Sequence, residues 1–299
     1  MSQPEPPISV PTRAARLPAN VSPFLLGLAG IALLTAMDGV VKALSPRYSA
    51  LHLTFLRFAV TAAMGALLFL ALRAPLPDRG VVTGNLLRGV LVALSTLGFF
   101  YGLAALPLAE VFIISFIAPL LVALIAIPLL GERPKPHVYL ALALGFAGVM
   151  ATAGGFNLKA IAPERALGIA AVLGCAVAYA LSIVLLRQRA KRGDPPLTIA
   201  LFQSAIPAAI LALPAALFWA PVAGADWPAF LVIGALGLAG HIALALAFAR
   251  GEASRLVAVE YTGLIWAILI GLAFFSEIPA PQALLGAALI VGACWMLRR

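Results

Sequence analysis

One stretch of the chain carries both features that decide the fold. Residues 108–136 read LAEVFIISFIAPLLVALIAIPLLGERPKP. The first part, 108–130, is almost entirely apolar, and a helix needs about 20 such residues to cross the hydrocarbon core of a bilayer. The end, Glu132-Arg133-Pro134-Lys135-Pro136, is a polar connector with the pattern E-x-P-x-P. The stretch therefore predicts a membrane-spanning helix followed by a distinctive loop.

The rest of the chain has the same apolar character. Of its 299 residues, 63% are hydrophobic and only 10% are charged, and the mean hydropathy is +1.08. Ordinary soluble domains contain about 25% charged residues, because they need a polar exterior. The composition thus excludes a soluble globular protein. Uniformly apolar stretches also favour helices over barrel strands, whose residues would alternate in character.

Ten apolar stretches have the length of membrane-spanning helices, and short connectors rich in Pro, Gly and charge join them. They cover 22–43, 51–72, 84–103, 108–130, 138–154, 166–187, 197–219, 228–249, 256–275 and 282–297. Residues 1–21 hold five prolines and little that could pack. We therefore expect a disordered cytoplasmic tail there, and not a signal peptide.

Lys and Arg are distributed very unequally between the two ends of these spans. With the N-terminus in the cytoplasm, fourteen fall on the cytoplasmic side and three or four on the other. The cytoplasmic set is Arg13, Arg16, Arg73, Arg79, Arg133, Lys135, Arg187, Arg189, Lys191, Arg192, Arg250, Arg255, Arg298 and Arg299. Positively charged loops remain in the cytoplasm, so we expect a bacterial inner-membrane protein with both termini inside.

A second copy of the E-x-P-x-P pattern follows the ninth span, at Glu277-Ile278-Pro279-Ala280-Pro281, 145 residues after the first. The same offset aligns Ala104 with Ala249 and Phe116 with Tyr261. Because all these matches share one register, they indicate an internal repeat.

The repeat divides the chain into two five-helix units, 22–154 and 166–297, with an external linker at 155–165. Five is odd, so the second unit must enter the membrane from the opposite side. We predict an all-α polytopic membrane protein with ten transmembrane helices, arranged as two inverted five-helix repeats. Inverted repeats are typical of secondary transporters, which bind substrate near the midplane between the repeats. The alternative is an old duplication that only builds a stable scaffold.

Two further patterns bear on how the helices pack. The offset of 145 aligns the small residues of Ala143-xxx-Ala147 with those of Ala288-xxx-Gly292. Small residues let membrane helices approach closely, so we expect them to pack the fifth and tenth spans or to form a dimer surface. Prolines interrupt the fourth and seventh spans; they are Pro119, Pro128, Pro207 and Pro214. Such prolines can free backbone carbonyls for a site or simply curve a helix.

Five ionisable residues lie well inside the spans, at Asp38, Lys42, Arg57, His241 and Glu260. A charge at the bilayer centre costs about 2.5–3.5 kcal/mol on insertion scales, so each of them needs a reason. Asp38 and Lys42 are four residues apart, so they share a helix face and can pair. At 1.5 Å per residue, Asp38 and Arg57 lie about 8 and 9 Å inside the outer helix ends.

These three residues could form one cluster in the outer half of the membrane. One interpretation is a structural ion-pair network with Lys42 reaching the interface; another is a site where Asp38 binds a substrate amine or a proton. His241 and Glu260 lie in the cytoplasmic halves of their spans, about 12 and 6 Å in from the cytoplasmic helix ends at 1.5 Å per residue. They could form a proton-coupling pair or a structural hydrogen bond between helices. Arg88 is expected to snorkel to the cytoplasmic interface.

The remaining candidates for substrate contact are six residues with uncharged side chains. They are Phe99, Tyr101, Ser115, Tyr179, Tyr261 and Trp266. Phe99 and Tyr101 directly precede the fourth helix, near the expected pseudo-symmetry axis. Ser115 stands in the first repeat where Glu260 stands in the second.

The chain lacks the usual signatures of enzymes and of cofactor sites. It has no GK pair for a P-loop, no HExxH and no GxSxG, and its two cysteines show no zinc or disulfide spacing. We expect no enzymatic activity, no cofactor and no metal. No aromatic-studded basic stretch suggests nucleic acid. The expected partners are a small-molecule substrate and the lipid bilayer, with protons as a possible coupling ion.

Over residues 22–297 the chain resembles the drug/metabolite transporter (DMT) superfamily, most closely its EamA-like exporters. The residues that carry the resemblance are Lys42, Arg57 in Leu56-Arg57-Phe58, Tyr101 before Ala104-Ala105, Pro119 in Ala118-Pro119-Leu120, and Gly131-Glu132. The resemblance implies a central cavity lined mainly by helices 1, 3, 4, 6, 8 and 9. It also implies export of amino acids or small metabolites, generally driven by the proton gradient. The YddG-type exporters, linked to aromatic amino acids, look like the nearest branch.

Two positions depart from that pattern. Leu264 stands in the second repeat where Pro119 stands in the first, and a carboxylate at Glu260 is not a family feature. The sequence as a whole predicts an inner-membrane secondary transporter that exports amino acids or related metabolites by alternating access. Efflux of cationic drugs is the first alternative, favoured if Asp38 and Glu260 face an aromatic cavity without an anion partner. A non-transporting scaffold or receptor is an alternative of another class.

Overall fold

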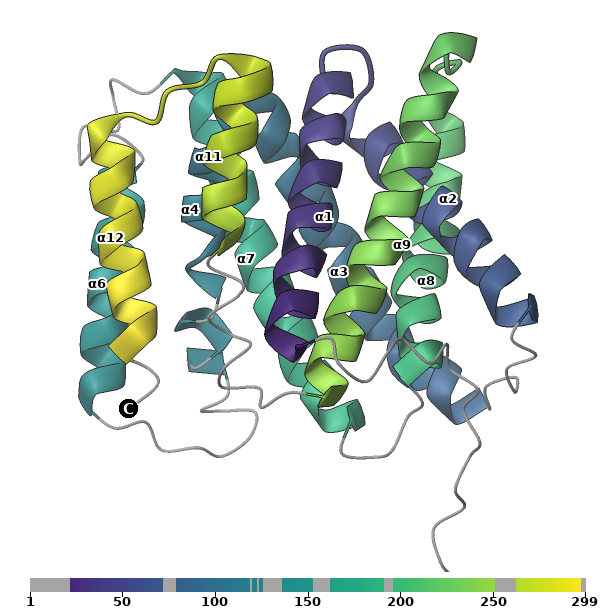
Figure 1. The fold of residues 1–299 in the computed structure, drawn as a ribbon, viewed down its shortest axis with the longest axis horizontal. Coiled ribbons are helices and arrows are strands. Elements are labelled where there is room, and N and C mark those ends of the chain that lie inside the picture. Colours follow the sequence, from purple (N-terminus) through teal and green to yellow (C-terminus); the bar gives the residue numbers. More distant parts are fainter. Residues whose placement is uncertain are drawn as a thin grey trace, which may run out of the picture.

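The computed structural model describes residues 22–71, 79–118, 120–122, 124–125, 136–152, 162–190, 196–250 and 262–296. Within these ranges ten helices stand side by side as a bundle (Figure 1). They are α1 (Pro23–Leu44), α2 (Ala50–Ala71), α3 (Arg79–Ala105), α4 (Leu108–Ser115), α6 (Pro136–Thr152), α7 (Pro163–Ala190), α8 (Pro196–Leu217), α9 (Trp227–Arg250), α11 (Thr262–Phe275) and α12 (Pro281–Met296), with a short 3-10 helix, η2 (Gly224–Asp226), before α9.

The helices begin and end where the proline-rich connectors predict. Five of them start at a proline, the residue favoured in a first helical turn because its missing N–H would have no partner there. By length and composition, five helices in the described ranges can cross a membrane, and five further apolar helices are shorter. The fourth span, predicted to run to 130, is divided in the structure. Helix α4 ends at Ser115, Phe116 and Ile117 form a turn, and the described residues 118, 120–122 and 124–125 are helical again.

The contacts between helices follow a two-fold pattern. In chain order α1, α2, α3, α4 and α6 correspond to α7, α8, α9, α11 and α12. Packing of α3 along α7 is matched by packing of α1 along α9, and the α2–α9 contact is matched by α8–α3. In the same way α1–α11 is matched by α7–α4, while α2–α8 and α6–α12 each join a helix to its own counterpart. The predicted fold class, ten helices as two inverted five-helix repeats, is confirmed.

The fifth and tenth spans pack together as predicted, but through other small residues. A Cβ on Gly286 of α12 would lie 2.5 Å from the carbonyl oxygen of Gly148 on α6, so the two backbones touch. The predicted residues on these helices face outward instead. They are Ala143, Ala147, Ala288 and Gly292, all exposed. A helix has several small faces, and only the packed structure decides which one meets a neighbour.

Lys42 holds one end of the bundle together. This is the end at which α1 stops and α2 starts, and we call it the α1–α2 end. The Lys42 ammonium bonds to Glu277 Oε1 at 2.8 Å and to the carbonyl oxygens of Leu106 and Leu103 at 2.6 and 3.2 Å. An ammonium has three donors, so these acceptors satisfy all of them. The other Glu277 oxygen accepts the backbone N–H of Leu108, at the start of α4, at 2.8 Å.

The sequence prediction that Lys42 could pair with Asp38 is therefore wrong. The two residues do share a face of α1, but Lys42 is drawn to the α3–α4 corner and to Glu277 from the other half of the chain. Glu277 reaches it because Ser276 ends α11 with a φ of 54°. That left-handed turn brings the backbone N–H of Glu277 onto the carbonyl of Gly271 at 2.9 Å.

Two more ion pairs join the halves of the chain at this same end. Arg165 at the start of α7 lies 2.8 Å from Glu110 at the start of α4. Arg47, after α1, lies 2.6 Å from Asp226, before α9, and the other Asp226 oxygen accepts the Tyr48 hydroxyl at 2.7 Å. All three ion pairs found among the described residues thus cross between the two halves at the α1–α2 end.

The α6–α12 contact predicts a position-specific effect of added volume. Gly286→Ala places a methyl group against the Gly148 backbone, which cannot rotate away, so we expect a loss of about 1–3 kcal/mol in the free energy of unfolding. Gly292→Ala is the matched control on the same helix, since a Cβ there meets nothing within 4 Å. The measurement is thermal unfolding of both variants in detergent. Equal melting temperatures would contradict the assigned interface.

The ion pair between Lys42 and Glu277 predicts energetic coupling. Lys42→Met and Glu277→Gln should each destabilise the protein by about 2 kcal/mol, because each strands a partner that is largely buried. The double variant should lose less than the sum, with a coupling of about 1 kcal/mol or more.

The matched control is a second cycle on Arg47 and Asp226. Arg47 is 56% exposed, and an ion pair with an exposed partner contributes below about 1 kcal/mol. Thermal unfolding of both sets of variants gives the comparison. Additive losses for Lys42 and Glu277 would show that the contact contributes nothing specific.

Candidate functional site

Two charged side chains lie deeper in the bundle than the ion pairs at its end. Asp38 is 8% exposed and Arg57 is 9% exposed. At 1.5 Å per residue, Asp38 lies about 9 Å before the end of α1, and Arg57 about 10 Å after the start of α2. Charged residues at this depth in membrane proteins are rare and mark functional sites.

Arg57 is held by neutral partners. Its guanidinium carbon lies 4.7 Å from the ring centroid of Phe58 and 5.7 Å from that of Phe100, and a cation over an aromatic face is stabilised. Nε donates to the sulphur of Met37 at 3.3 Å, and Nη1 to the hydroxyl of Thr96 at 3.5 Å. A guanidinium has five N–H donors, and sulphur is a weak acceptor. In the described part of the chain, most of the hydrogen-bonding capacity of Arg57 is therefore unused.

Asp38 is next to this cation but not paired with it. Arg57 is the charged group whose field acts on the Asp38 carboxylate, and Met37, which Arg57 contacts, is its chain neighbour. Yet among the residues that the structure describes, none forms an ion pair or hydrogen bond with Asp38. The expected cluster of Asp38, Lys42 and Arg57 is thus split. Lys42 belongs to the bundle end, while Asp38 and Arg57 form a buried pair of opposite, unsatisfied charges.

His241 and Thr61 extend this region along α9 and α2. His241 Nδ1 lies 2.6 Å from the carbonyl oxygen of Gly237, one turn earlier, which leaves Nε2 as an acceptor. The Thr61 hydroxyl, one turn along α2 from Arg57, is buried and has no hydrogen-bond partner among the described residues. A Cβ on Gly237 would lie 3.1 Å from the Met37 sulphur and 3.5 Å from the Thr61 hydroxyl, so α9 packs directly on this region.

We name this region the buried polar cluster and define it by its five polar residues. They are Asp38 on α1, Arg57 and Thr61 on α2, Thr96 on α3, and His241 on α9. The close crossing of α1 and α9 holds it in place: Gly30 and Gly240 face each other, and a Cβ on either would lie 3.1 Å from the other's carbonyl oxygen. The chemistry available to the cluster follows from its charges. Away from water, the Arg57 guanidinium can bind an anionic group and the Asp38 carboxylate can bind a cationic group.

The predicted aromatic residues separate into two groups. Phe99 belongs to a ring group that begins beside Arg57, since its centroid lies 6.5 Å from Phe100 and 5.6 Å from Phe112 on α4. Trp266, on α11, has a buried indole N–H that meets no hydrogen-bond acceptor within the described ranges. Tyr101 and Tyr179 are instead 42% and 41% exposed. The first group can line a buried site, whereas the second faces outward.

Ser115, Glu260 and Tyr261 complete the comparison with the sequence predictions. The Ser115 hydroxyl bonds to the carbonyl of Phe112 at 2.9 Å, within its own helix. Glu260 and Tyr261 lie outside the described residues. The predicted contact between Glu260 and His241 is therefore not described by the structure.

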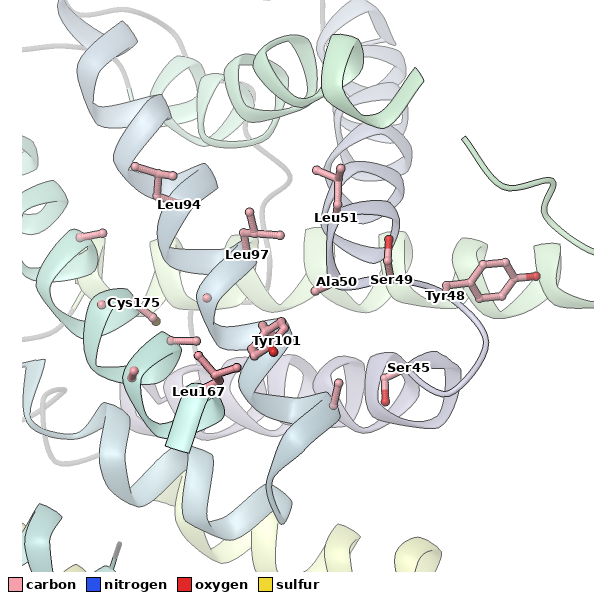
Figure 2. A pocket seen from close by; sticks show the side chains of 16 residues that line it. Ser45, Tyr48, Ser49, Ala50, Leu51, Leu94, Leu97, Tyr101, Leu167 and Cys175 are labelled. Atoms are coloured by element: carbon pink, nitrogen blue, oxygen red, sulfur yellow. The ribbon is translucent and has the colours of Figure 1, made fainter. Parts of the chain in front are cut away.

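A large groove formed by the described residues lies elsewhere. It has a volume of about 900 Å³ and runs between α2, α3 and α7. Figure 2 shows Leu51, Leu94 and Leu97 along it, with Leu167 and Cys175 from α7. Tyr101 is the only predicted site residue that lines it, and no charged side chain does. An apolar surface groove in a membrane-spanning bundle does not supply partners for a polar substrate.

Arg88 corrects another expectation. It does not snorkel to the interface: it is 4% exposed, and its Nη2 donates to Gln203 Oε1 at 2.8 Å, joining α3 to α8. The apolar helices around it leave an amide as its nearest strong acceptor. Within the described ranges no group of three or more His, Cys, Asp or Glu side chains could hold a metal ion.

The sequence analysis did not assign a role to several residues of the α1–α2 end and the buried polar cluster. Glu277 and Glu110 could have been found, because each is an acidic residue at the edge of an apolar stretch. Their positions in a connector and in a first helical turn are ordinary places for an acidic residue, however. Thr61 and Thr96 carried no such signal, since threonine is common in membrane helices and only the surrounding packing makes it part of a site.

Comparison with known proteins places this architecture in a family. The chain matches the model of the EamA-like transporter family twice, over residues 22–154 and 166–299. A solved crystal structure matches with a TM-score of 0.61 at 26% identity, covering 92% of this chain and 96% of that one.

Named relatives transport different small molecules. The pseudopaline exporter CntI of Pseudomonas aeruginosa (strain UCBPP-PA14) is 29% identical over 269 residues, 89% of this chain and 92% of that protein. An S-adenosylmethionine uptake transporter of Rickettsia felis is 25% identical, over 70% of this chain and 69% of its own. The aromatic amino acid exporter YddG of Ancylobacter novellus is 32% identical, over 65% of this chain and 68% of its own.

Both halves of the chain thus match one family model, the helices form two inverted five-helix repeats, and the relatives are membrane transporters. The chain is a multi-pass membrane protein of the drug/metabolite transporter superfamily, and it belongs to the EamA-like transporter family.

Proposed function

We propose that the protein is a secondary transporter that exports amino acids, aromatic ones among them, or related small metabolites across the bacterial inner membrane. The observation that carries this proposal is the buried polar cluster, where Asp38 and Arg57 lie close together but do not satisfy one another. A buried charge without a partner is costly. A polar solute that binds there supplies the missing partners, which makes the cluster suited to a substrate rather than to a purely structural role.

The ion pairs at the α1–α2 end support alternating access. Every one of them joins the first half of the chain to the second. In a transporter built from inverted repeats, the halves rock against each other around a fixed site, so contacts that join them at one end must form in one state and break in the other. We propose, from the distribution of Lys and Arg, that both termini lie in the cytoplasm. In that orientation the α1–α2 end faces outward, and the ion pairs join the two halves on the outside.

Efflux of cationic drugs remains the second candidate, because Asp38 is a buried carboxylate near aromatic rings. Arg57 weakens this candidate, since a purely cationic substrate would be repelled by a guanidinium in the same cluster. The names of the relatives do not choose between substrates, as they include both exporters and an uptake transporter with dissimilar solutes.

The test is uptake of a panel of labelled amino acids into liposomes that contain the purified protein, with and without an imposed pH gradient. We expect saturable uptake of some members, absent from protein-free liposomes. Arg57→Met should reduce it by about tenfold or more, because a charge-assisted hydrogen bond to substrate is lost.

Glu164→Gln is the control, since this carboxylate is exposed in the first turn of α7, and its uptake should equal that of the unmodified protein. If no amino acid enters while a cationic dye does, the drug-efflux alternative replaces the proposal. If neither enters, the scaffold or receptor alternative does.

A further inference from the structure

We infer that Arg57 and Asp38 bind the two charged groups of a zwitterionic substrate, Arg57 its carboxylate and Asp38 its ammonium group. The inference rests on the proposed function. It adds which residue binds which charged group, and it narrows the substrate to an α-amino acid whose side chain is apolar or aromatic.

The first step is that, among the residues that the structure describes, neither Asp38 nor Arg57 forms an ion pair. Both side chains are more than nine-tenths buried. Lys42, the other cation on α1, is fully engaged by Glu277 and two backbone carbonyls, so it cannot serve Asp38. Arg57, in turn, is clamped by rings and by weak acceptors. Two neighbouring side chains of opposite charge that do not form an ion pair can bind a ligand that carries one positive and one negative group.

The second step is the match between these groups and an amino acid. A guanidinium presents parallel N–H donors that fit the two oxygens of a carboxylate, and an ammonium presents three donors to a carboxylate acceptor. An α-amino acid carries both groups on one carbon, so it offers each of these two oppositely charged neighbours a partner of the opposite sign. The unpartnered Thr61 hydroxyl, one turn away, adds a neutral polar contact.

The third step concerns the substrate side chain. Phe100 packs on the Arg57 guanidinium, and the rings of Phe99 and Phe112 continue from it. An apolar or aromatic substrate side chain that extends away from the two charged groups can therefore contact these aromatic rings. A substrate with only an amine would meet the repulsion of Arg57, and one with only a carboxylate would meet that of Asp38.

The test measures selectivity, which a merely structural role would not change. For an amino acid that the panel shows to be transported, unlabelled amine and acid analogues compete with its labelled form. For L-phenylalanine the analogues are phenethylamine and 3-phenylpropionate. In the unmodified protein the zwitterion should compete at least about tenfold better than either analogue, because each analogue lacks one charge-assisted contact.

Two variants, each lacking one of the two charges, should each lose discrimination against one of the two analogues. Arg57→Gln should bind the zwitterion and the amine equally well, while still discriminating against the acid. Asp38→Asn should bind the zwitterion and the acid equally well, while still discriminating against the amine. Glu164→Gln should retain the full preference.

Folding and transport failures are separated from this result by a second measurement. Each full-length variant is purified in detergent, and its melting temperature is measured with and without each of the three compounds. The rise in melting temperature reports binding where uptake is too weak to measure. Arg57→Lys keeps the charge and should keep the preference for a carboxylate. If both variants weaken all three compounds equally, the inference is overturned while the transport proposal stands. If the unmodified protein neither transports nor is stabilised by any amino acid, the transport proposal itself fails.

Discussion

The arrangement of this bundle depends on one ammonium group. Lys42 lies near the end of α1, where an unpaired cation would be expensive, and all three of its donors are taken by groups from other helices. Glu277 comes from the second half of the chain, and its other oxygen binds the start of α4. One side chain thus ties α1, the α3–α4 corner and the α11–α12 connection together. Such a saturated contact is stable while it lasts, yet it can break as a unit when the two halves separate.

The same contact explains why the charges deeper in the bundle are unsatisfied. Asp38 and Lys42 share a face of α1, and elementary helix geometry would let them pair. Glu277 and the backbone carbonyls bind the lysine, so in the described part of the chain Arg57 is the charged neighbour that remains for Asp38. The rings around Arg57 hold the guanidinium in place. Charged residues inside a membrane are costly and usually serve a function, and under the proposed function a transported solute supplies the missing partners for part of each cycle.

The inverted repeat gives these two regions different roles. Contacts between a helix and its own counterpart, such as α6 with α12, lie on the pseudo-symmetry axis and can keep their packing whichever way the halves tilt. The Gly148–Gly286 crossing has this character, since its backbones are in direct contact. Ion pairs at one end of the bundle have no such freedom. Stable axial packing combined with breakable terminal contacts is what a rocking mechanism requires.

Much of the fold could be predicted from the sequence, because lipid imposes a simple rule: every span must be a helix of apolar residues long enough to cross it. That rule, together with the E-x-P-x-P repeat, predicted ten helices and their inverted arrangement. Asp38, Arg57 and His241 also stood out, since polar residues are conspicuous in an apolar background. Helix α4 ends earlier than predicted, at Ser115, because hydropathy does not register the turn at Phe116 and Ile117 that interrupts the fourth span.

What the sequence by itself determined was therefore the set of helices, their order and the list of charged residues that need a partner. Only the tertiary structure decided which partner each one has. Lys42 bonds to a residue 235 positions away, and Arg88 bonds to Gln203 on another helix. The physical reason is that helix periodicity specifies which residues share a face, whereas the partner of a charged side chain in the membrane interior is whichever acceptor the packed helices bring within hydrogen-bonding distance. That choice depends on helices distant in sequence, so local patterns do not contain it.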